Sequence, residues 1–190
     1  MNLAHAPLSW LPLLIGACAA QPQMRNPAPG TIAGVVVDAK GRPARAKVAV
    51  VRVSGSHSMP TNDDGCFEFA DLRDGTYVVT ATTTEGQVAV LADVPTGSRA
   101  TALPALSPGA TLWVELCGRP SARLAVFLGD LRVHDFTLRE NKPVPVVVPP
   151  GEISVLLYDG DLENERLIAL GAGDSQELAL ALPSARQPRQ

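Results

Sequence analysis

From Thr31 onward, apolar and polar residues alternate in short stretches, separated by turn signals at spacings of about 8–12 residues. Alternate apolar positions should face a core, and they are Phe67/Phe69, Tyr77/Val79/Ala81, Leu112/Val114/Leu116, Leu124/Val126/Leu128, Val144/Val146/Val148, Ile153/Val155/Leu157 and Leu178/Leu180/Leu182. Most turns pair Gly with Lys, Asp, Glu, Thr or Pro, and Gly supplies the positive φ that tight turns require. The best helical candidate, around Leu162–Ala169, contains only a short acidic stretch without a helical stripe. The pattern therefore predicts an all-β fold of the sandwich type.

The chain also repeats itself. The hairpin signal Gly41-Arg42-Pro43 recurs as Gly118-Arg119-Pro120, and the strand that begins after Gly75 recurs after Gly151. The two pairs are separated by 77 and 76 residues, which is the signature of a tandem duplication. We therefore expect two small Ig-like domains, at residues 30–108 and 109–184, followed by a disordered tail at 185–190. Units of this size bury only a modest fraction of their surface, so each should gain stability by packing on the other.

The first copy carries a recognisable series of motifs. They are Gly34-Val35-Val36-Val37-Asp38, Gly41-Arg42-Pro43, Ala46-Lys47-Val48, Thr61-Asn62-Asp63-Asp64-Gly65-Cys66-Phe67-Glu68-Phe69 and Leu72-Arg73-Asp74-Gly75-Thr76-Tyr77. Over residues 31–106 this series resembles the carboxypeptidase regulatory-like, or transthyretin-like, family of β-sandwiches. The resemblance implies a core position for Tyr77 and no peptidase activity, because in that family the module accompanies a catalytic domain and does not contain it. The second copy keeps the Gly-x-Pro hairpin but lacks the Phe-x-Phe strand, so its assignment to the same fold depends on the repeat.

The N-terminus has the features of a targeting segment. Residues 1–17 contain no acidic residue, Lys or Arg, and they end in a short apolar run typical of a secretory signal. Ile15-Gly16-Ala17-Cys18 resembles the bacterial lipobox, in which the cysteine is lipidated and becomes the first residue; ordinary signal cleavage at Ala17-Cys18-Ala19 is the alternative. Residues 18–29 are rich in Pro and polar residues and are expected to form a flexible tether.

These features predict a location. Because Ala19 follows the cysteine where enterobacteria-like systems use Asp to retain lipoproteins at the inner membrane, we expect an outer-membrane lipoprotein, periplasmic or surface-exposed. A soluble periplasmic or secreted protein is the alternative.

Composition and charge narrow the function classes. Apolar residues make up 46% of the chain and aromatic residues only 4%, which predicts a core of Val, Ala and Leu. The formal net charge is −3, and no run of Lys or Arg stands out that could neutralise phosphates. Binding to nucleic acid is therefore not expected.

No pattern typical of catalysis is found. After the predicted signal only His57 and His134 remain; His57 is expected in a polar loop at Ser54–Ser58 and His134 on a strand, facing solvent. Two isolated histidines do not supply the three or four ligands of a zinc site. Neither Ser54 nor Ser56 lies in a Gly-x-Ser-x-Gly motif. The chain is accordingly predicted to be neither an enzyme nor a cofactor-binding protein.

Two acidic stretches were considered for calcium. Asn62-Asp63-Asp64-Gly65 is predicted to be a hairpin turn. Asp159, Asp161 and Glu163 place oxygen donors at alternate positions and form a calcium candidate, with a solvated acidic loop as the alternative.

Cys66 and Cys117 are the cysteines left if Cys18 is lipidated. In an exported protein such a pair often forms a disulfide, which here would join the two domains. Two free thiols are the open alternative, because sequence alone does not place the Cα atoms within bridging distance.

The sequence thus favours a non-enzymatic exported lipoprotein, an interaction or structural module of the cell envelope. Such a protein would be bound to the membrane through its lipid anchor. It would also have a protein partner that the sequence does not identify. The alternative is a carbohydrate- or small-ligand-binding protein at the cell surface, for which Trp113, Tyr77 and Tyr158 are the available stacking groups; a hydrolase ranks below both.

Overall fold

The computed structural model describes residues 28–97, 101–139 and 142–183, and these residues form strands and turns without a helix. The first half contains β1 (Ile32–Val35), β2 (Lys47–Arg52), β3 (Gly55–Pro60), β4 (Cys66–Phe69), β5 (Thr76–Thr82), β6 (Gln87–Pro95), β7 (Thr101–Ala102) and β8 (Ser107–Pro108). The second half contains β9 (Ala110–Cys117), β10 (Ser121–Leu128), β11 (Leu131–Arg139), β12 (Val144–Val148), β13 (Gly151–Asp159), β14 (Leu162–Leu170) and β15 (Ser175–Ala181). The all-β class predicted from the sequence is confirmed. Within the described ranges, no helix is long and apolar enough to cross a membrane.

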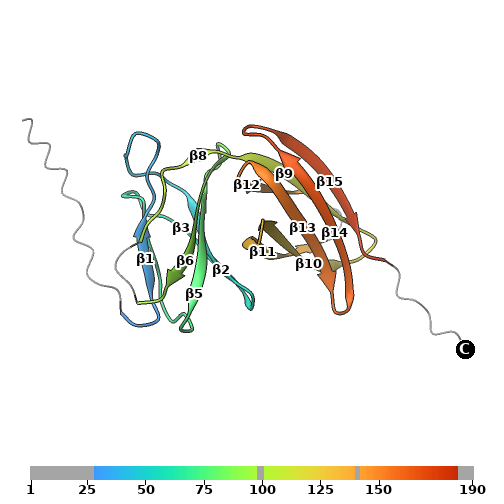
Figure 1. The fold of residues 1–190 in the computed structure, drawn as a ribbon, viewed down its shortest axis with the longest axis horizontal. Helices are drawn as coiled ribbons and strands as arrows, with labels where there is room; N and C mark the ends of the chain where they lie inside the picture. Colours follow the sequence, from blue (N-terminus) through green and yellow to red (C-terminus); the bar gives the residue numbers. More distant parts are fainter. Residues whose placement is uncertain (1–27, 98–100, 140–141, 184–190) are drawn as a thin grey trace, which may run out of the picture.

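Each half is a sandwich of two sheets, and the two halves lie side by side (Figure 1). The first domain has the sheets β4-β1-β7 and β3-β2-β5-β6-β8, and the second has β12-β9-β15 and β11-β10-β13-β14. Apart from β8, which leads into the second domain, the strand order is the same in both. The pairing agrees as well, because β1 with β7 and β9 with β15 are the parallel pairs.

The repeated glycines adopt matching backbone conformations. The φ angle is 74° at Gly41 and 76° at Gly118, and it is 141° at Gly75 and 137° at Gly151. These angles lie in a region that residues other than glycine rarely adopt, so each repeated motif in the sequence corresponds to a turn that favours glycine. The repeat visible in the sequence is thus also a repeat of turn geometry.

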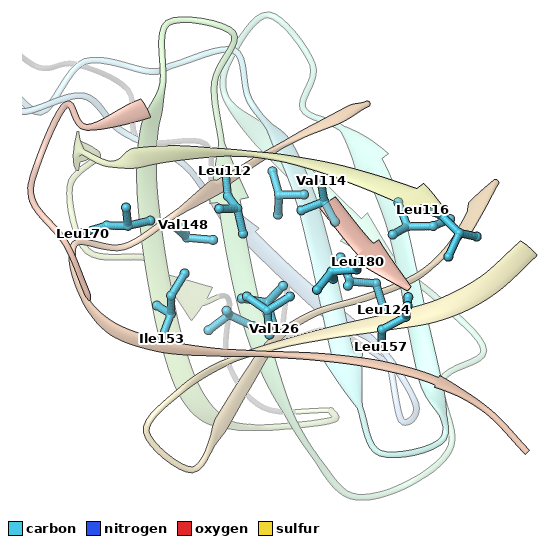
Figure 2. Close-up of a cluster of buried hydrophobic side chains, with 14 of the residues drawn as sticks. Leu112, Val114, Leu116, Leu124, Val126, Val148, Ile153, Leu157, Leu170 and Leu180 are labelled. Atoms are coloured by element: carbon cyan, nitrogen blue, oxygen red, sulfur yellow. The ribbon is translucent and has the colours of Figure 1, made fainter. Parts of the chain in front are cut away.

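Each sandwich has its own apolar core. In the second domain the alternate residues Leu112, Val114 and Leu116 of β9 are fully buried and face Leu124 and Leu157 across the sandwich (Figure 2). The core of the first domain contains Ile32, Val36, Ala46, Val48, Val50, Phe67, Phe69, Leu72, Tyr77, Val79, Ala81, Ala89, Val94, Leu103 and Leu106. The predicted alternation is therefore realised along the strands, with Leu128, Val144, Leu178 and Leu182 only half-buried at the margins.

Two stretches differ from expectation in local structure. The acidic stretch that was the best helical candidate is strand β14, paired along its whole length with β13. Ser54–Ser58 was predicted as a polar loop, but only Val53 and Ser54 form the turn, and β3 begins at Gly55. A two-residue turn leaves the following polar residues free to extend the ladder with β2.

The domains pack through β11, which contacts the outer face of β2, β3 and β5. Val51 and Thr80 point away from the first core, yet they are only 1% and 2% exposed. Val78 and Val90, also on the first domain, pack against the core cluster of the second. The outer face of the five-stranded sheet is thus partly an interface, and the rest of it lines a groove.

Candidate functional site

A groove of about 1100 Å³ lies between the two domains. The first domain contributes side chains of β2, β3 and β5 together with the β5–β6 hairpin, and the second contributes β9, β11 and β12. Both domains are needed to form it, so neither sandwich alone would present this surface.

The wall from the second domain is the outer face of the β12-β9-β15 sheet. Trp113 lies at its centre and is 39% exposed, because the alternate residues of β9 occupy the core. Pro145 on β12 and Glu177 on β15 stand in register with Trp113 on either side. Thr111, one step along the same face, also lines the groove. The result is an indole on a flat sheet surface, flanked by a proline ring and a carboxylate.

The wall from the first domain is mostly hydroxyl-bearing. Thr80 and Thr82 lie on the outer face of β5, and Lys47 on β2 is directly opposite Thr82 in the antiparallel ladder. All three line the groove. The hydroxyls of Thr80 and Thr82 make no hydrogen bond to another residue in the described part of the chain.

His134 lies at the junction of the two walls. It is half-buried, and its Nε2 donates to the carbonyl oxygen of Val147 at 2.8 Å. Burial lowers the pKa of this imidazole, the hydrogen bond to Val147 opposes that shift, and the charge of Lys47 adds to it. The expectation that His134 faces solvent holds only in part, because β12 and the first domain cover one side of the ring.

The lowered pKa of His134 gives a pH dependence with a definite sign. An unfolded histidine takes up its proton near pH 6.5, before the folded one does, so stability should fall as the pH drops from about 7 to about 5. The slope from this group has an upper limit of about 1.4 kcal/mol per pH unit. His134→Gln, which keeps a donor for Val147, should show a shallower decline in urea denaturation. Equal slopes for the two proteins would contradict the assignment.

Next to His134, the carboxylate of Asp135 is completely buried and held by two arginines. Arg123 Nη2 is 2.6 Å from Oδ1, and Arg132 Nη1 is 2.7 Å from Oδ2. The pair with Asp135 raises the pKa of the Arg123 guanidinium. Arg132 also donates to the carbonyl oxygen of Val53 at 3.3 Å, and Ser56 Oγ donates to the backbone carbonyl oxygen of Asp135. The cluster therefore joins the β2–β3 hairpin of the first domain to β11 of the second.

The sequence did not single out Asp135, Thr80 or Thr82. All three alternate with core residues along their strands, so the sequence pattern predicts that they face solvent. No local signal indicates that the other domain covers that face.

The remaining candidate residues are not brought together. His57 is exposed, as expected, but lies on β3 and not in a loop. Tyr77 is buried and donates its hydroxyl to the Arg73 carbonyl oxygen at 2.9 Å, while the Tyr158 ring packs under the Arg123 guanidinium. Of the three aromatic candidates, only Trp113 lines the groove.

The calcium candidate is not a cluster. Asp159, Asp161 and Glu163 lie at the β13–β14 hairpin, where Asp159 pairs with Arg119 at 2.8 Å and Glu163 is opposite Tyr158 in the ladder. No group of three or more His, Cys, Asp or Glu side chains in the described ranges could hold a metal ion. Asp159 is opposite Leu162 in the same ladder, one step from the Tyr158–Glu163 pair, so Asp159 and Glu163 point to opposite faces of the hairpin.

The hairpin turn at Asn62–Gly65 is present. Asn62 Oδ1 accepts hydrogen bonds from the backbone nitrogens of Asp64 and Cys66, at 3.1 and 2.8 Å.

The two cysteines are free thiols in the structure. Cys66 begins β4 in the first domain and Cys117 ends β9 in the second, and both are half-buried. Burial, reinforced by the charge of Asp64, raises the pKa of the Cys66 thiol. The proposed bridge is therefore not formed. Cys18, the predicted lipidation site, lies outside the described residues.

Comparison with known proteins identifies one domain. Residues 31–106 match the carboxypeptidase regulatory-like domain family, over the same range as the motifs in the sequence. No curated protein matches the chain.

Three solved structures match the chain at low sequence identity and low TM-score. The Bacillus anthracis TIE protein is 15% identical with a TM-score of 0.36, over 82% of this chain and 34% of that one, so the chain spans about a third of its length. A DUF3823 family protein from Bacteroides ovatus is 11% identical with a TM-score of 0.32, over 76% of this chain and 100% of that one. The major pilin from Streptococcus pyogenes is 10% identical with a TM-score of 0.21, over 82% of this chain and 98% of that one. At these values the similarity supports no statement about function.

Proposed function

We propose, from the premise that residues 31–106 form a carboxypeptidase regulatory-like domain, that the chain is a non-enzymatic interaction module of the cell envelope. In this proposal Cys18 carries the lipid anchor, residues 18–29 form the tether, and the two sandwiches present the groove between them to a binding partner.

The groove is the observation that carries the proposal. It combines an exposed indole, free hydroxyls and charges of both signs between two sandwiches. Sites of this kind, mostly apolar with a few directed polar groups, are typical of ligand recognition.

The engagement of the Asp135 carboxylate supports a structural role for that group and not a catalytic one. Nε2 of His134 is bound to a backbone carbonyl, and both oxygens of Asp135 are bound to arginines. A general base needs a free acceptor atom within reach of a substrate proton. The Asp135 carboxylate and the imidazole Nε2 are therefore used for structure.

One experiment tests both the anchor and the groove. The full chain is expressed in a lipoprotein-processing bacterium with a photo-reactive benzophenone residue at one of two positions. The test position is Pro145, which lines the groove. The control position is Leu167, which is 69% exposed on β14. We expect the chain in the membrane fraction, with an acylated mass starting at Cys18, and cross-linked adducts from position 145 but not from position 167.

Cys18→Ser should abolish both acylation and membrane retention, whereas Cys117→Ser, a thiol removed elsewhere, should leave both unchanged. A soluble wild-type chain without acyl mass would contradict the anchor. Equal adducts from positions 145 and 167 would contradict the groove as the binding surface.

A further inference from the structure

The geometry points to a specific ligand class for this groove: we propose that it binds a neutral oligosaccharide whose sugar rings stack on Trp113. The inference rests on the proposed function, since it names the ligand of the same surface.

The platform around Trp113 suits a sugar ring. The outer face of β9 keeps the indole exposed, and the Pro145 ring stands beside it in register on the neighbouring strand. A pyranose has faces of C–H groups that pack on an aromatic surface, while its hydroxyls project around the rim. An indole supplies apolar area for such contacts together with a polar N–H.

Several polar atoms around the platform have no hydrogen-bond partner among the residues that the structure describes. Neither the Trp113 indole nitrogen nor the hydroxyls of the half-buried Thr82 and Thr111 bond to another residue in the described ranges. Each hydroxyl can donate one hydrogen bond and accept others. Sugar hydroxyls have the same dual capacity, so the two sets are complementary.

The charges favour a neutral ligand. Arg45 and Lys47 line the groove together with Asp63 and Glu85, so neither sign dominates. Arg45 is already paired with Asp63 at 2.6 Å. A polyanion would require a surface of one sign to attract it, which this groove lacks.

An extended peptide added to the sheet edge fits less well. Strand addition needs free N–H and C=O groups along an edge strand. On β12, the edge strand beside Trp113, Pro145 has no N–H and the Val147 carbonyl oxygen already accepts from His134. Within three residues, this edge therefore has one donor and one acceptor that are not available to pair with an added strand.

The size of the groove favours a chain of several sugars. Its volume of about 1100 Å³ exceeds the range of roughly 300–1,000 Å³ typical of small-molecule pockets. An open groove of this size can accommodate consecutive rings, of which one or two would stack on Trp113.

The test uses the full chain and defined probes. Maltohexaose, cellohexaose, laminarihexaose and N-acetylchitohexaose are titrated up to about 10 mM by calorimetry and tryptophan fluorescence. We expect saturable binding of at least one hexasaccharide, with a change in Trp113 emission. Trp113→Phe, which leaves only Trp10 as an indole, gives the fluorescence background.

Three variants test the contacts. Trp113→Ala should weaken binding at least tenfold, while Trp113→Phe, which keeps a ring, should retain part of it. Thr82→Val, which removes only a hydroxyl, should weaken binding about fivefold. Leu167→Ala, on the outer face of the other sheet, should bind like wild type. Thermal unfolding of each variant confirms that it is folded.

Four outcomes would overturn the proposal: no binding of any hexasaccharide, undiminished binding by folded Trp113→Ala, binding of hexagalacturonate in place of the neutral sugars, or binding of a strand-forming peptide there instead. None of these would change the membrane retention or the cross-links expected from position 145. Failure of the ligand class and failure of the envelope module are therefore distinguishable.

Discussion

Replacing Asp135 with asparagine is expected to lower the free energy of unfolding by about 3 kcal/mol or more. The carboxylate is completely buried, and each of its oxygens is bound to a different arginine. Asparagine has nearly the same shape but no charge, so the Arg132 guanidinium, only 19% exposed, would remain buried without a counter-ion. Breaking a buried ion pair from one side costs more than the pair contributes, because an unpaired charge is left in a poorly solvated site.

Urea denaturation of the full chain measures this effect, and Asp63→Asn is the matched control. Asp63 also pairs with an arginine at 2.6 Å, but both side chains are about four-fifths exposed. Water compensates for the loss there, so the control should stay within about 0.5 kcal/mol of wild type. If the two variants unfold at the same urea concentration, the Asp135 cluster does not stabilise the protein.

The cluster also links the domains, so its loss should affect cooperativity. Arg132 bonds to the Val53 carbonyl oxygen across the interface, and Ser56 bonds to the backbone of Asp135. We expect the wild type to unfold in one transition and Asp135→Asn to unfold in two, since each sandwich keeps its own core.

The interior of the sandwiches could be read from the sequence. Leu112, Val114 and Leu116 alternate with polar or exposed residues and all face the core, because a strand points successive side chains to opposite faces. The same reasoning identified the turn at Asn62–Gly65. These predictions depend only on local geometry, which the sequence determines directly.

The outer faces could not be read in the same way. Thr80 and Asp135 both occupy positions that alternation assigns to solvent, and both are buried because the other domain covers them. A sequence shows which face of a strand is turned away from its own core. It does not show whether that face meets water, a second domain or a ligand.

The candidate site was accordingly predicted only in part. Trp113 was identified as an available stacking group from its residue type, but the groove around it depends on how two sandwiches pack. His134 was seen as an isolated histidine, although the structure places it where the two walls meet. Sequence spacing also suggested that Asp159, Asp161 and Glu163 could act together, which the two faces of the β13–β14 hairpin prevent.

Substitution of Gly34 by alanine should destabilise the first domain by about 3 kcal/mol. Gly34 is paired in parallel with Thr101 of β7, and a Cβ at this position would lie 2.2 Å from the Thr101 carbonyl oxygen and 2.6 Å from the Phe67 ring. Neither neighbour can give way easily, because one is backbone and the other is a packed core side chain. Relief of the clash requires β7 to move away from β1, which would also disturb Leu103 in the first core.

Gly41→Ala is the control that separates crowding from the general loss of a glycine. A Cβ at Gly41 would meet no atom within 4 Å, so its cost comes only from the φ of 74° and should be about 1 kcal/mol. Gly34 needs no unusual φ, and its requirement is for space alone. Urea denaturation should therefore place Gly34→Ala well below Gly41→Ala in stability. The reverse order would show that β1 and β7 approach less closely than the structure places them.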